Sequence, residues 1–163
     1  MWLNIIITML TGYMLGNLNG AFLMGHRLAG EDIRSKGSGN AGLTNFIRNY
    51  GAKPAIGVII TDMGKAALAC FVGGGLLAPF GHEIAGRALG GLCVILGHAF
   101  PALLGFKGGK GILSGVTVAL CLDWRIGLFV FGIFLAAYWL THYVSLGSVL
   151  SSGSFGFIYA LFH

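Results

Sequence analysis

Charged residues are scarce in this chain, because Lys, Arg, Asp and Glu make up only 9% of its 163 residues. A soluble globular domain carries roughly 25% of them, so this composition excludes an ordinary soluble domain. Only three residues are cysteine, and no two of these are spaced as Cys-x-x-Cys. Cys70, Cys93 and Cys121 therefore predict neither a disulfide framework nor a zinc site, and we expect them to be small core residues.

Apolar runs take up most of the chain, which is 56% hydrophobic and contains 29 glycines. A transmembrane helix needs roughly 20 apolar residues, and polar breaks divide the sequence into runs near that length. We predict an all-α, polytopic integral membrane protein that forms a single membrane domain over residues 1–163. The predicted spans cover residues 2–24, 54–80, 85–104, 112–122 and 126–141, and a sixth span starts near Leu146.

A polar, glycine-rich stretch, GSGNAGLTNFIR at residues 37–48, interrupts these runs. Glycines lack a Cβ atom, so successive backbone N–H groups can converge on one point, and a helix that begins near Thr44 would direct its positive end there. Arg48 lies one helical turn later and can bind the same anion through two hydrogen bonds. A second basic stretch, KGGKG, follows at residues 107–111. Together the two loops predict a phosphate site at a membrane surface.

Cationic residues gather in alternate loops. The first predicted loop holds Arg27, Arg34, Lys36, Arg48 and Lys53, the third holds Lys107 and Lys110, and the loops between them hold only Arg87 and Arg125. By the positive-inside rule the odd-numbered loops are cytoplasmic and the N-terminus lies outside. The fifth loop, residues 142–145, then joins both glycine loops on the cytoplasmic side. Cations spread in this way indicate topology instead of a basic face, so nucleic-acid binding is not expected.

Four segments carry a family resemblance: residues 37–48, the DMGK stretch at 62–65, the GHAFP run at 97–101 that leads into 106–111, and YVSL at 143–146. In order, spacing and loop placement they resemble the bacterial acyl-phosphate:glycerol-3-phosphate acyltransferase family, PlsY. The resemblance covers essentially the whole chain. It implies a multi-pass enzyme of the bacterial plasma membrane with seven spans, the N-terminus outside and the active site facing the cytoplasm. Such an enzyme moves an acyl group from acyl phosphate to glycerol 3-phosphate and gives lysophosphatidic acid for phospholipid synthesis.

The resemblance also implies roles for the loop residues. The implied catalytic residues are Ser38, Arg48 and Lys107; the implied substrate-binding residues are Gly37, Gly39, Asn40, Gly42, Thr44, Asn45, Gly108, Gly109, Lys110 and Ser145. The donor is already an activated mixed anhydride, so we expect no covalent intermediate, no metal and no other cofactor. The expected partners are the two substrates, the lipid bilayer and an enzyme that produces the acyl phosphate.

Several of these residues have a second interpretation. Lys107 and Lys110 can serve the positive-inside rule alone, and Ser145 can cap the next helix. Asp62 and Lys65 lie well inside the second predicted span on one helix face, where an internal ion pair and a substrate contact are equally good interpretations. His98 is expected to be a hydrogen-bonding residue at a helix end.

The sequence allows two other functions. The spacing of His26 and Glu31 is close to the His-x4-Asp pair of a different acyltransferase class, but the carboxylate there should be Asp. A transporter or channel for a phosphorylated solute would use the same cationic loops with Asp62 and Lys65 as its pathway. The charged residues gather at one membrane face and the spans show no inverted repeat, so the acyltransferase is the better hypothesis.

The end of the sequence departs from the family pattern. Family members end with a further span and a cytoplasmic segment that carries a His-Arg-x-Asn-Ile-like motif, whereas this sequence stops at Leu161-Phe162-His163. We therefore expect a fragment that is inactive by itself, with a naturally shortened homologue as the alternative.

Overall fold

The computed structural model describes residues 1–162, so His163 and the predictions that concern it lie outside the described residues. The described part contains eight α-helices, three short 3-10 helices and no strand, which confirms the all-α prediction. The α-helices are α1 (Trp2–Gly16), α2 (Gly20–Ala29), α3 (Leu43–Tyr50), α4 (Ala52–Leu77), α5 (Glu83–Ala99), α6 (Ile112–Leu122), α7 (Trp124–Thr141) and α8 (Val144–Phe162). The 3-10 helices are η1 (Ile33–Ser35), η2 (Ala78–Phe80) and η3 (Ala102–Leu104).

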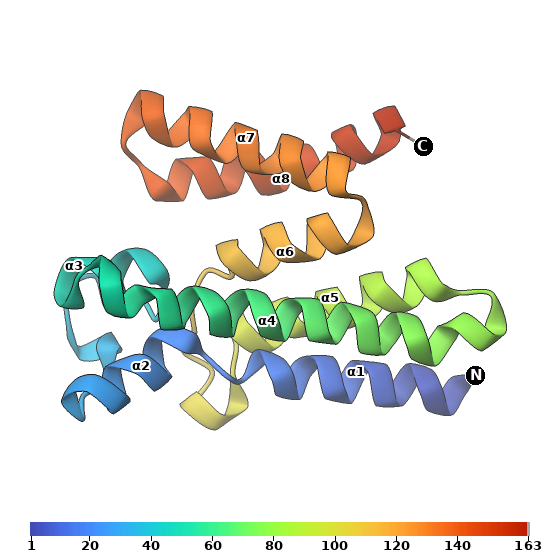
Figure 1. Ribbon diagram of the computed structural model, residues 1–163, viewed down its shortest axis with the longest axis horizontal. Helices are drawn as coiled ribbons and strands as arrows, with labels where there is room; N and C mark the ends of the chain where they lie inside the picture. The colour runs from blue at the N-terminus through green and yellow to red at the C-terminus, as the bar shows by residue number, and fades with distance from the viewer. Residues whose placement is uncertain (163) are drawn as a thin grey trace.

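The helices form two groups with α6 between them (Figure 1). Helices α1, α4 and α5 pack against one another as a bundle, and α7 pairs with α8 as a hairpin. Helix α6 contacts α4 and α5 on one side and α7 on the other. Helices α2 and α3 continue the bundle beyond one end of α1, where they pack on α4.

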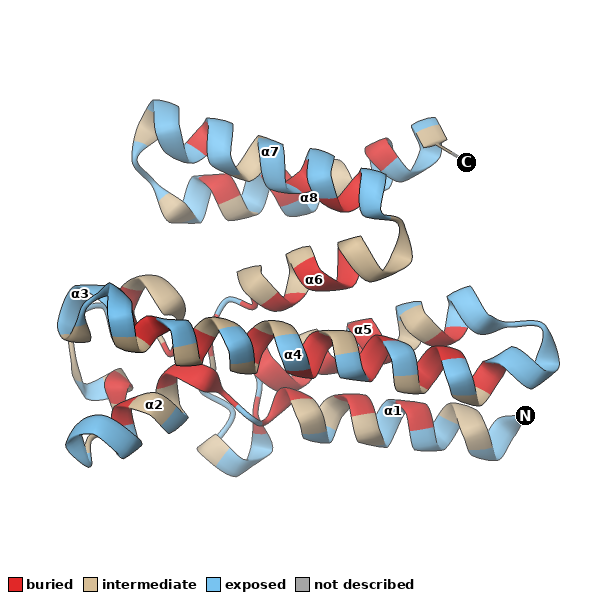
Figure 2. Ribbon diagram, viewed as in Figure 1, coloured by how far each residue is buried: buried red, intermediate tan, exposed pale blue. Residues whose placement is uncertain are grey.

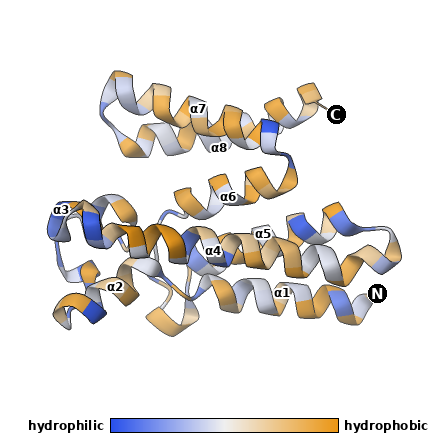
Figure 3. Ribbon diagram, in the orientation of Figure 1, coloured by the Kyte–Doolittle hydropathy of each residue, from blue (hydrophilic) through white to orange (hydrophobic). Residues whose placement is uncertain are grey.

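Five segments are long and apolar enough to cross a bilayer: Trp2–Ala29, Ala52–Phe80, Glu83–Leu104, Trp124–Thr141 and Val144–Phe162. The chain is therefore a multi-pass membrane protein. Apolar residues cover most of the length of these helices (Figure 3), and the outward faces of the helices are exposed while buried residues face the neighbouring helices (Figure 2). Large exposed side chains such as Trp2, Trp139 and Leu140 lie where lipid would surround them.

The predicted fourth span has the same bounds as α6, but this helix is too short to cross a bilayer by itself. Helix α6 has 11 residues, which at ~1.5 Å per residue is about 17 Å long, whereas the hydrocarbon core is about 30 Å thick. It starts beside the middle of α4 (Figure 1), so the segment before it must enter the bundle. The predicted start of a sixth span lies in α8, which has 19 residues in the described part of the chain and is long and apolar enough to cross a bilayer.

The first predicted span is two helices instead of one, because the chain breaks between Gly16 and Gly20. Asn19 caps α2 by accepting a hydrogen bond from the Phe22 N–H at 2.9 Å. Its amide nitrogen donates to the Ala41 carbonyl at 2.9 Å, which ties the break to the first glycine loop. Side chains thus replace the backbone hydrogen bonds that a broken helix loses inside a membrane.

Close approach of the bundle helices depends on glycine. A Cβ atom at Gly73 of α4 would collide with the Gly86 carbonyl of α5, and one at Gly97 of α5 would collide with the Tyr13 carbonyl of α1. Small residues let helix backbones approach in lipid, where the hydrophobic effect between helices is absent. The high glycine content therefore fixes the packing of the bundle that supports the loops.

Candidate functional site

Three segments that are distant in sequence meet at one end of the molecule: the loop before α3, the segment before α6 and the turn between α7 and α8 (Figure 1). They surround a cavity of about 850 Å³. The polar lining residues include Ser38, Asn40, Thr44, Asn45, Arg48, Asp62, His98, Lys110, His142 and Ser145. The apolar lining residues include Met63, Ile112, Leu113, Val116, Leu120, Leu128, Phe131, Phe134 and Leu135.

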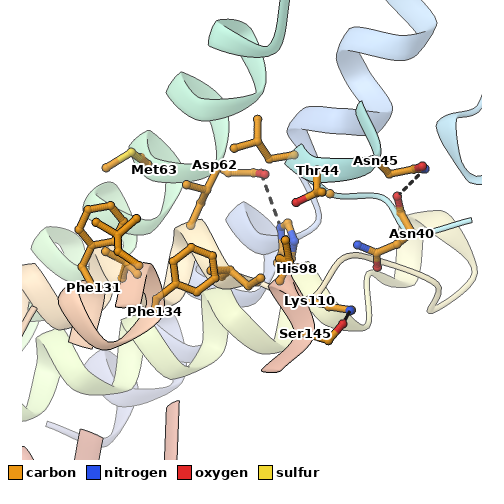
Figure 4. A pocket seen from close by; sticks show the side chains of 18 of the residues that line it. Asn40, Thr44, Asn45, Asp62, Met63, His98, Lys110, Phe131, Phe134 and Ser145 are labelled. Carbon is orange, nitrogen blue, oxygen red and sulfur yellow. Dashed lines mark hydrogen bonds and ion pairs between the residues drawn. The ribbon is translucent and has the colours of Figure 1, made fainter. Parts of the chain in front are cut away.

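The cavity is polar at one end and apolar at the other. In Figure 4, Asn40, Thr44, Lys110 and Ser145 lie on one side of His98, and the aromatic side chain of Phe131 lies on the opposite side. The apolar end continues between α4, α6 and α7. Such a shape suits a ligand with an anionic head and a hydrocarbon tail.

Asn45 holds the first glycine loop in place. Its side-chain oxygen accepts a hydrogen bond from the Ser38 N–H at 3.0 Å, and its amide nitrogen donates to the carbonyls of Lys36 and Asn40, each at 3.0 Å. The residue is only 2% exposed. Although Asn45 borders the cavity, its side chain is committed to the loop, so it acts as a positioning residue instead of the expected substrate contact.

The first glycine loop forms the expected cradle of free N–H groups only in part, since no described residue accepts a hydrogen bond from the N–H groups of Gly37 and Asn40 while three others are taken. The Ser38 N–H is taken by Asn45, the Gly39 N–H donates to the Lys36 carbonyl at 3.0 Å, and the Gly42 N–H donates to the Asn40 carbonyl at 2.9 Å. Gly37 and Gly39 do not line the cavity; they have positive φ angles of 55° and 72° and so shape the turn. The first turn of α3 and the side chains of the loop offer further donors for an anion.

The second glycine stretch is also occupied by the protein. The Gly108 N–H donates to the Ala99 carbonyl at 3.2 Å and the Gly109 N–H to the His98 carbonyl at 3.1 Å. These bonds satisfy carbonyls that the end of α5 leaves free. Neither glycine lines the cavity, so the expectation that they bind substrate is not supported. A Cβ atom at Gly109 would collide with the His98 ring and the Ala41 carbonyl, which explains the requirement for glycine.

Only one of the two lysines of this stretch lines the cavity. The Lys107 side chain is exposed and does not line the cavity. Its backbone is held outward because its carbonyl accepts a hydrogen bond from Arg34 Nη1 at 3.0 Å. Lys110 does line the cavity, and its Nζ donates to Ser145 Oγ at 2.6 Å. Ser145 thereby connects the α7–α8 turn to the segment before α6.

Arg48 and Lys110 supply the positive charge of the cavity, because no described carboxylate pairs with either of them. The carboxylates of the neighbouring loop are already neutralised. The hydrogen bond from Lys36 holds the pKa of Glu31 below its usual value, with the Tyr50 hydroxyl contributing, and Arg34 lowers the pKa of Asp32 in the same way. The polar end therefore keeps a net positive charge that favours an anion.

An ionised cluster lies deeper in the cavity wall. Asp62 and Lys65 of α4 pair at 2.9 Å, with side chains that are 3% exposed, and Lys65 Nζ is 2.8 Å from His98 Nδ1. Lys65 also donates to the Leu18 carbonyl at 2.6 Å, and Asp62 accepts from the Gly20 N–H at 3.1 Å. The break between α1 and α2 supplies the last two partners, so this cluster depends on that break.

Sequence reasoning placed too little weight on His98 and none on His142. Asp62 and His98 border the cavity, so the buried ion pair is part of the cavity wall. The available signal for Asp62 was an ionisable residue inside a span, which is usually paired or functional. His98 gave no such signal, because only the packing of α4 on α5 brings it to Lys65.

The other candidate chemistries find no support in the geometry. Glu31 forms an ion pair with Lys36 and accepts a hydrogen bond from the Tyr50 hydroxyl at 3.1 Å, while the His26 ring stacks on Phe22. These two residues therefore do not act as an acid–base pair. Among the described residues, no group of three His, Cys, Asp or Glu side chains lies close enough to hold a metal ion.

Comparison with known proteins identifies relatives along nearly the whole chain. Residues 6–163 match the family model described as glycerol-3-phosphate acyltransferase. The chain is 40% identical over 152 residues to the glycerol-3-phosphate acyltransferase of Synechococcus sp. (strain CC9902), which covers 93% of this chain and 74% of that protein. It is 37% identical over 154 residues to that of Clostridioides difficile (strain 630), covering 91% and 73%.

Solved structures give the same relationship. The chain superimposes on the crystal structure of PlsY (YgiH), an integral membrane glycerol 3-phosphate acyltransferase, in its glycerol 3-phosphate form with a TM-score of 0.83 and 29% identity. That match covers 96% of this chain and 77% of the other. The lysophosphatidic acid form of PlsY matches with a TM-score of 0.79 and 26% identity, covering 96% and 76%.

Proposed function

The chain belongs to the glycerol-3-phosphate acyltransferase family, and we propose that it transfers a fatty acyl group from an acyl phosphate to glycerol 3-phosphate in the cavity described above. It is a membrane acyltransferase of phospholipid synthesis whose acceptor is glycerol 3-phosphate. The chemistry of the cavity supports an acyl phosphate as the donor.

One observation supports an acyl phosphate as the donor: a single cavity has a cationic, hydroxyl-rich end and continues into a long apolar groove. A fatty acyl phosphate has the same two parts, an anionic head and a hydrocarbon tail. The head would lie against Ser38, Thr44 and Arg48 near the start of α3, where the helix dipole also favours an anion. The tail would lie along α6 and α7 against Val116 and Phe131.

Glycerol 3-phosphate brings a second phosphate, which needs its own cationic contact. Lys110 and Ser145 lie across the cavity from the α3 loop and can supply it, while Arg48 is able to bridge to either phosphate. The protein then has two tasks: to hold the glycerol hydroxyl against the acyl carbonyl, and to stabilise the oxyanion and the departing phosphate. Neither task requires a covalent intermediate, because the donor is already activated.

The charge distribution supports a cytoplasmic position for this end of the molecule. Seven of the cationic residues lie at the α3 end: Arg27, Arg34, Lys36, Arg48, Lys53, Lys107 and Lys110. The positive-inside rule then puts the N-terminus of α1 outside. The relatives named above are bacterial, which supports the bacterial plasma membrane as the location. An enzyme that makes acyl phosphate would deliver its product to this same face.

A reconstituted transfer assay tests the proposal. The purified protein in detergent is given palmitoyl phosphate and glycerol 3-phosphate, and lysophosphatidic acid and inorganic phosphate are measured, with palmitoyl-CoA as the comparison donor. We expect turnover with the acyl phosphate only. Arg48→Lys keeps the charge but loses the planar two-point contact, so kcat/KM should fall by about 30- to 150-fold, which corresponds to ~2–3 kcal/mol.

Arg27→Lys is the matched control, because Arg27 is an exposed arginine outside the cavity. It should match the wild type. Turnover with palmitoyl-CoA alone would refute the donor assignment, and an unaffected Arg48→Lys variant would refute the role of Arg48. Flux of glycerol 3-phosphate across proteoliposomes without acyl transfer would support the transporter instead.

A further inference from the structure

The buried ammonium of Lys65 has no proton left for a ligand. A lysine carries three N–H donors and no acceptor. Lys65 Nζ has its three nearest partners at 2.6 Å (Leu18 O), 2.8 Å (His98 Nδ1) and 2.9 Å (Asp62 Oδ1), and the Gly16 carbonyl at 3.3 Å shares one of these protons. Lys65 is 4% exposed. It therefore acts on the cavity only through its neighbours.

Lys65 determines which nitrogen of His98 carries the proton. His98 Nδ1 lies 2.8 Å from Lys65 Nζ and 3.6 Å from Asp62 Oδ1, so its hydrogen-bond partner is the lysine and not the carboxylate. An ammonium only donates, so this contact favours the tautomer with the ring proton on Nε2. The side chain is 3% exposed and lines the cavity, yet no described residue accepts a hydrogen bond from Nε2. Among the described residues, Arg87 Nε is the one fully buried side-chain nitrogen or oxygen atom that has no hydrogen-bond partner, so His98 Nε2 is open to the cavity. An N–H group on the cavity wall without a partner in the protein is available to a ligand atom.

His98 lies where the two ends of the cavity meet. Figure 4 shows its ring between the polar side chains of Lys110 and Thr44 and the aromatic side chains of Phe131 and Phe134. In an acyl phosphate, the carbonyl group joins the phosphate to the hydrocarbon chain. When the phosphate lies at the polar end of the cavity and the hydrocarbon chain at the apolar end, the carbonyl oxygen between them lies near His98.

We propose that His98 Nε2–H donates a hydrogen bond to the acyl carbonyl oxygen and to the oxyanion formed from it, and that Lys65 and Asp62 are positioning residues for this donor. The inference rests on the proposed function and names a contact within that same site. Since Lys65 fixes the proton on Nε2, the ring is a neutral donor that needs no reorganisation during the reaction.

The glycerol hydroxyl oxygen bonds to the carbonyl carbon, and the π pair of the carbonyl moves onto its oxygen, which accepts from His98. That pair then re-forms the double bond while the bond between the carbonyl carbon and the phosphate oxygen breaks. The departing phosphate takes up the hydroxyl proton, so the products are the ester and hydrogen phosphate.

Kinetics of two His98 variants test the donor. His98→Leu fills similar space without an N–H group, and its kcat should fall by roughly 10²-fold, as for loss of an oxyanion donor, while the KM values stay nearly unchanged. His98→Gln places an amide N–H near the position of Nε2 and should recover much of that loss. His26→Leu, in an exposed histidine outside the cavity, is the control and should equal the wild type.

Nitrogen NMR gives a readout that is independent of turnover. The chain has five histidines, and the ring signals of His98 in protein labelled with [15N]histidine are assigned by their loss in His98→Gln. At neutral pH they should show the neutral tautomer with the proton on Nε2. The double variant Asp62→Asn, Lys65→Met removes both charges together and should release this preference.

The outcomes separate the two proposals. If the wild type turns over acyl phosphate but His98→Leu is equally fast, or His98→Gln is as slow as His98→Leu, the His98 assignment alone is overturned. A charged ring or an Nδ1–H tautomer in the wild type also overturns it. If the wild type shows no turnover, the proposed function fails and the His98 contact fails with it.

Discussion

Replacing the buried amide of Asn45 by a carboxylate should open the first glycine loop. In Asn45→Asp one oxygen can still accept from the Ser38 N–H, but the group that donated to Lys36 and Asn40 becomes an acceptor. Two backbone carbonyls then face a carboxylate oxygen. Because the site is 2% exposed, water does not readily replace the lost donors.

The size of the effect follows from these two hydrogen bonds. Each net hydrogen bond contributes ~1–1.5 kcal/mol, so losing both shifts the balance between the closed and open loop by about 2–3 kcal/mol. A change of 1.4 kcal/mol is tenfold at room temperature, which makes the open loop roughly 30- to 140-fold more populated. The bundle should stay folded, because Asn45 lies outside the spanning segments.

Limited proteolysis measures this population directly. Trypsin cleaves after Lys36, inside the loop, and when the loop opens and closes rapidly the cleavage rate follows the open population. The fragment that ends at Lys36 is followed by mass spectrometry, and acyl transfer is assayed in parallel. Asn45→Asp should show faster cleavage by the factor above together with reduced kcat/KM.

Asn49→Asp is the matched control. Asn49 is exposed, and its amide nitrogen donates to the Asn45 carbonyl at 2.8 Å and to Asn45 Oδ1 at 3.2 Å. Asn49→Asp removes these donors but keeps the bonds from Asn45 to Lys36 and Asn40, so it should change cleavage and turnover much less than Asn45→Asp. If Asn45→Asp is cleaved after Lys36 no faster than Asn49→Asp, the hydrogen bonds of Asn45 do not hold the loop and the reasoning is refuted.

Two further predictions follow from the cavity and its loop. Val116→Trp, on α6 in the apolar groove, should shift preference toward shorter acyl phosphates, as measured by relative kcat/KM across chain lengths; an unchanged order would exclude this groove as the tail site. Arg34 lowers the pKa of Asp32 in the folded protein, so their contact stabilises above the unfolded pKa of about 4 and is lost as the pH falls through the lower folded value. Asp32→Asn should therefore lose less thermal stability than the wild type between pH 5 and pH 3 (about one unit either side of that pKa) in detergent melts, and identical slopes would contradict this.

Three statements stay predictions: the orientation in the membrane, the single domain over residues 1–163 and the roles of the individual site residues. Of the thirteen residues expected at the site, the structure places eight in the cavity lining: Ser38, Asn40, Gly42, Thr44, Asn45, Arg48, Lys110 and Ser145. The remaining five, Gly37, Gly39, Lys107, Gly108 and Gly109, do not line it. Four of these are glycines whose conformation or close contacts shape the loops around the cavity.

The sequence by itself determined the class of the protein and the end at which its chemistry lies. Long apolar runs with few charges require membrane-spanning helices, since a backbone in lipid must satisfy its own hydrogen bonds. The positions of the cations and of the two glycine stretches are local properties, and together with the order of the apolar runs they predicted that three loops converge. Arg48 and Ser38 could be identified from their neighbours in sequence.

Only the tertiary structure decided which groups are free for a ligand. The N–H groups of Gly108 and Gly109 look available in sequence, but the end of α5 uses them. Lys110 faces the cavity and Lys107 does not. Arg34 donates hydrogen bonds to the carbonyls of Leu104 and Lys107 and so holds the turn that leads from α5 to Lys107. His98 contacts Lys65, 33 residues away in the chain, through the packing of α4 on α5. Hydrogen-bond partners of buried groups come from helix packing, and no local pattern records that packing.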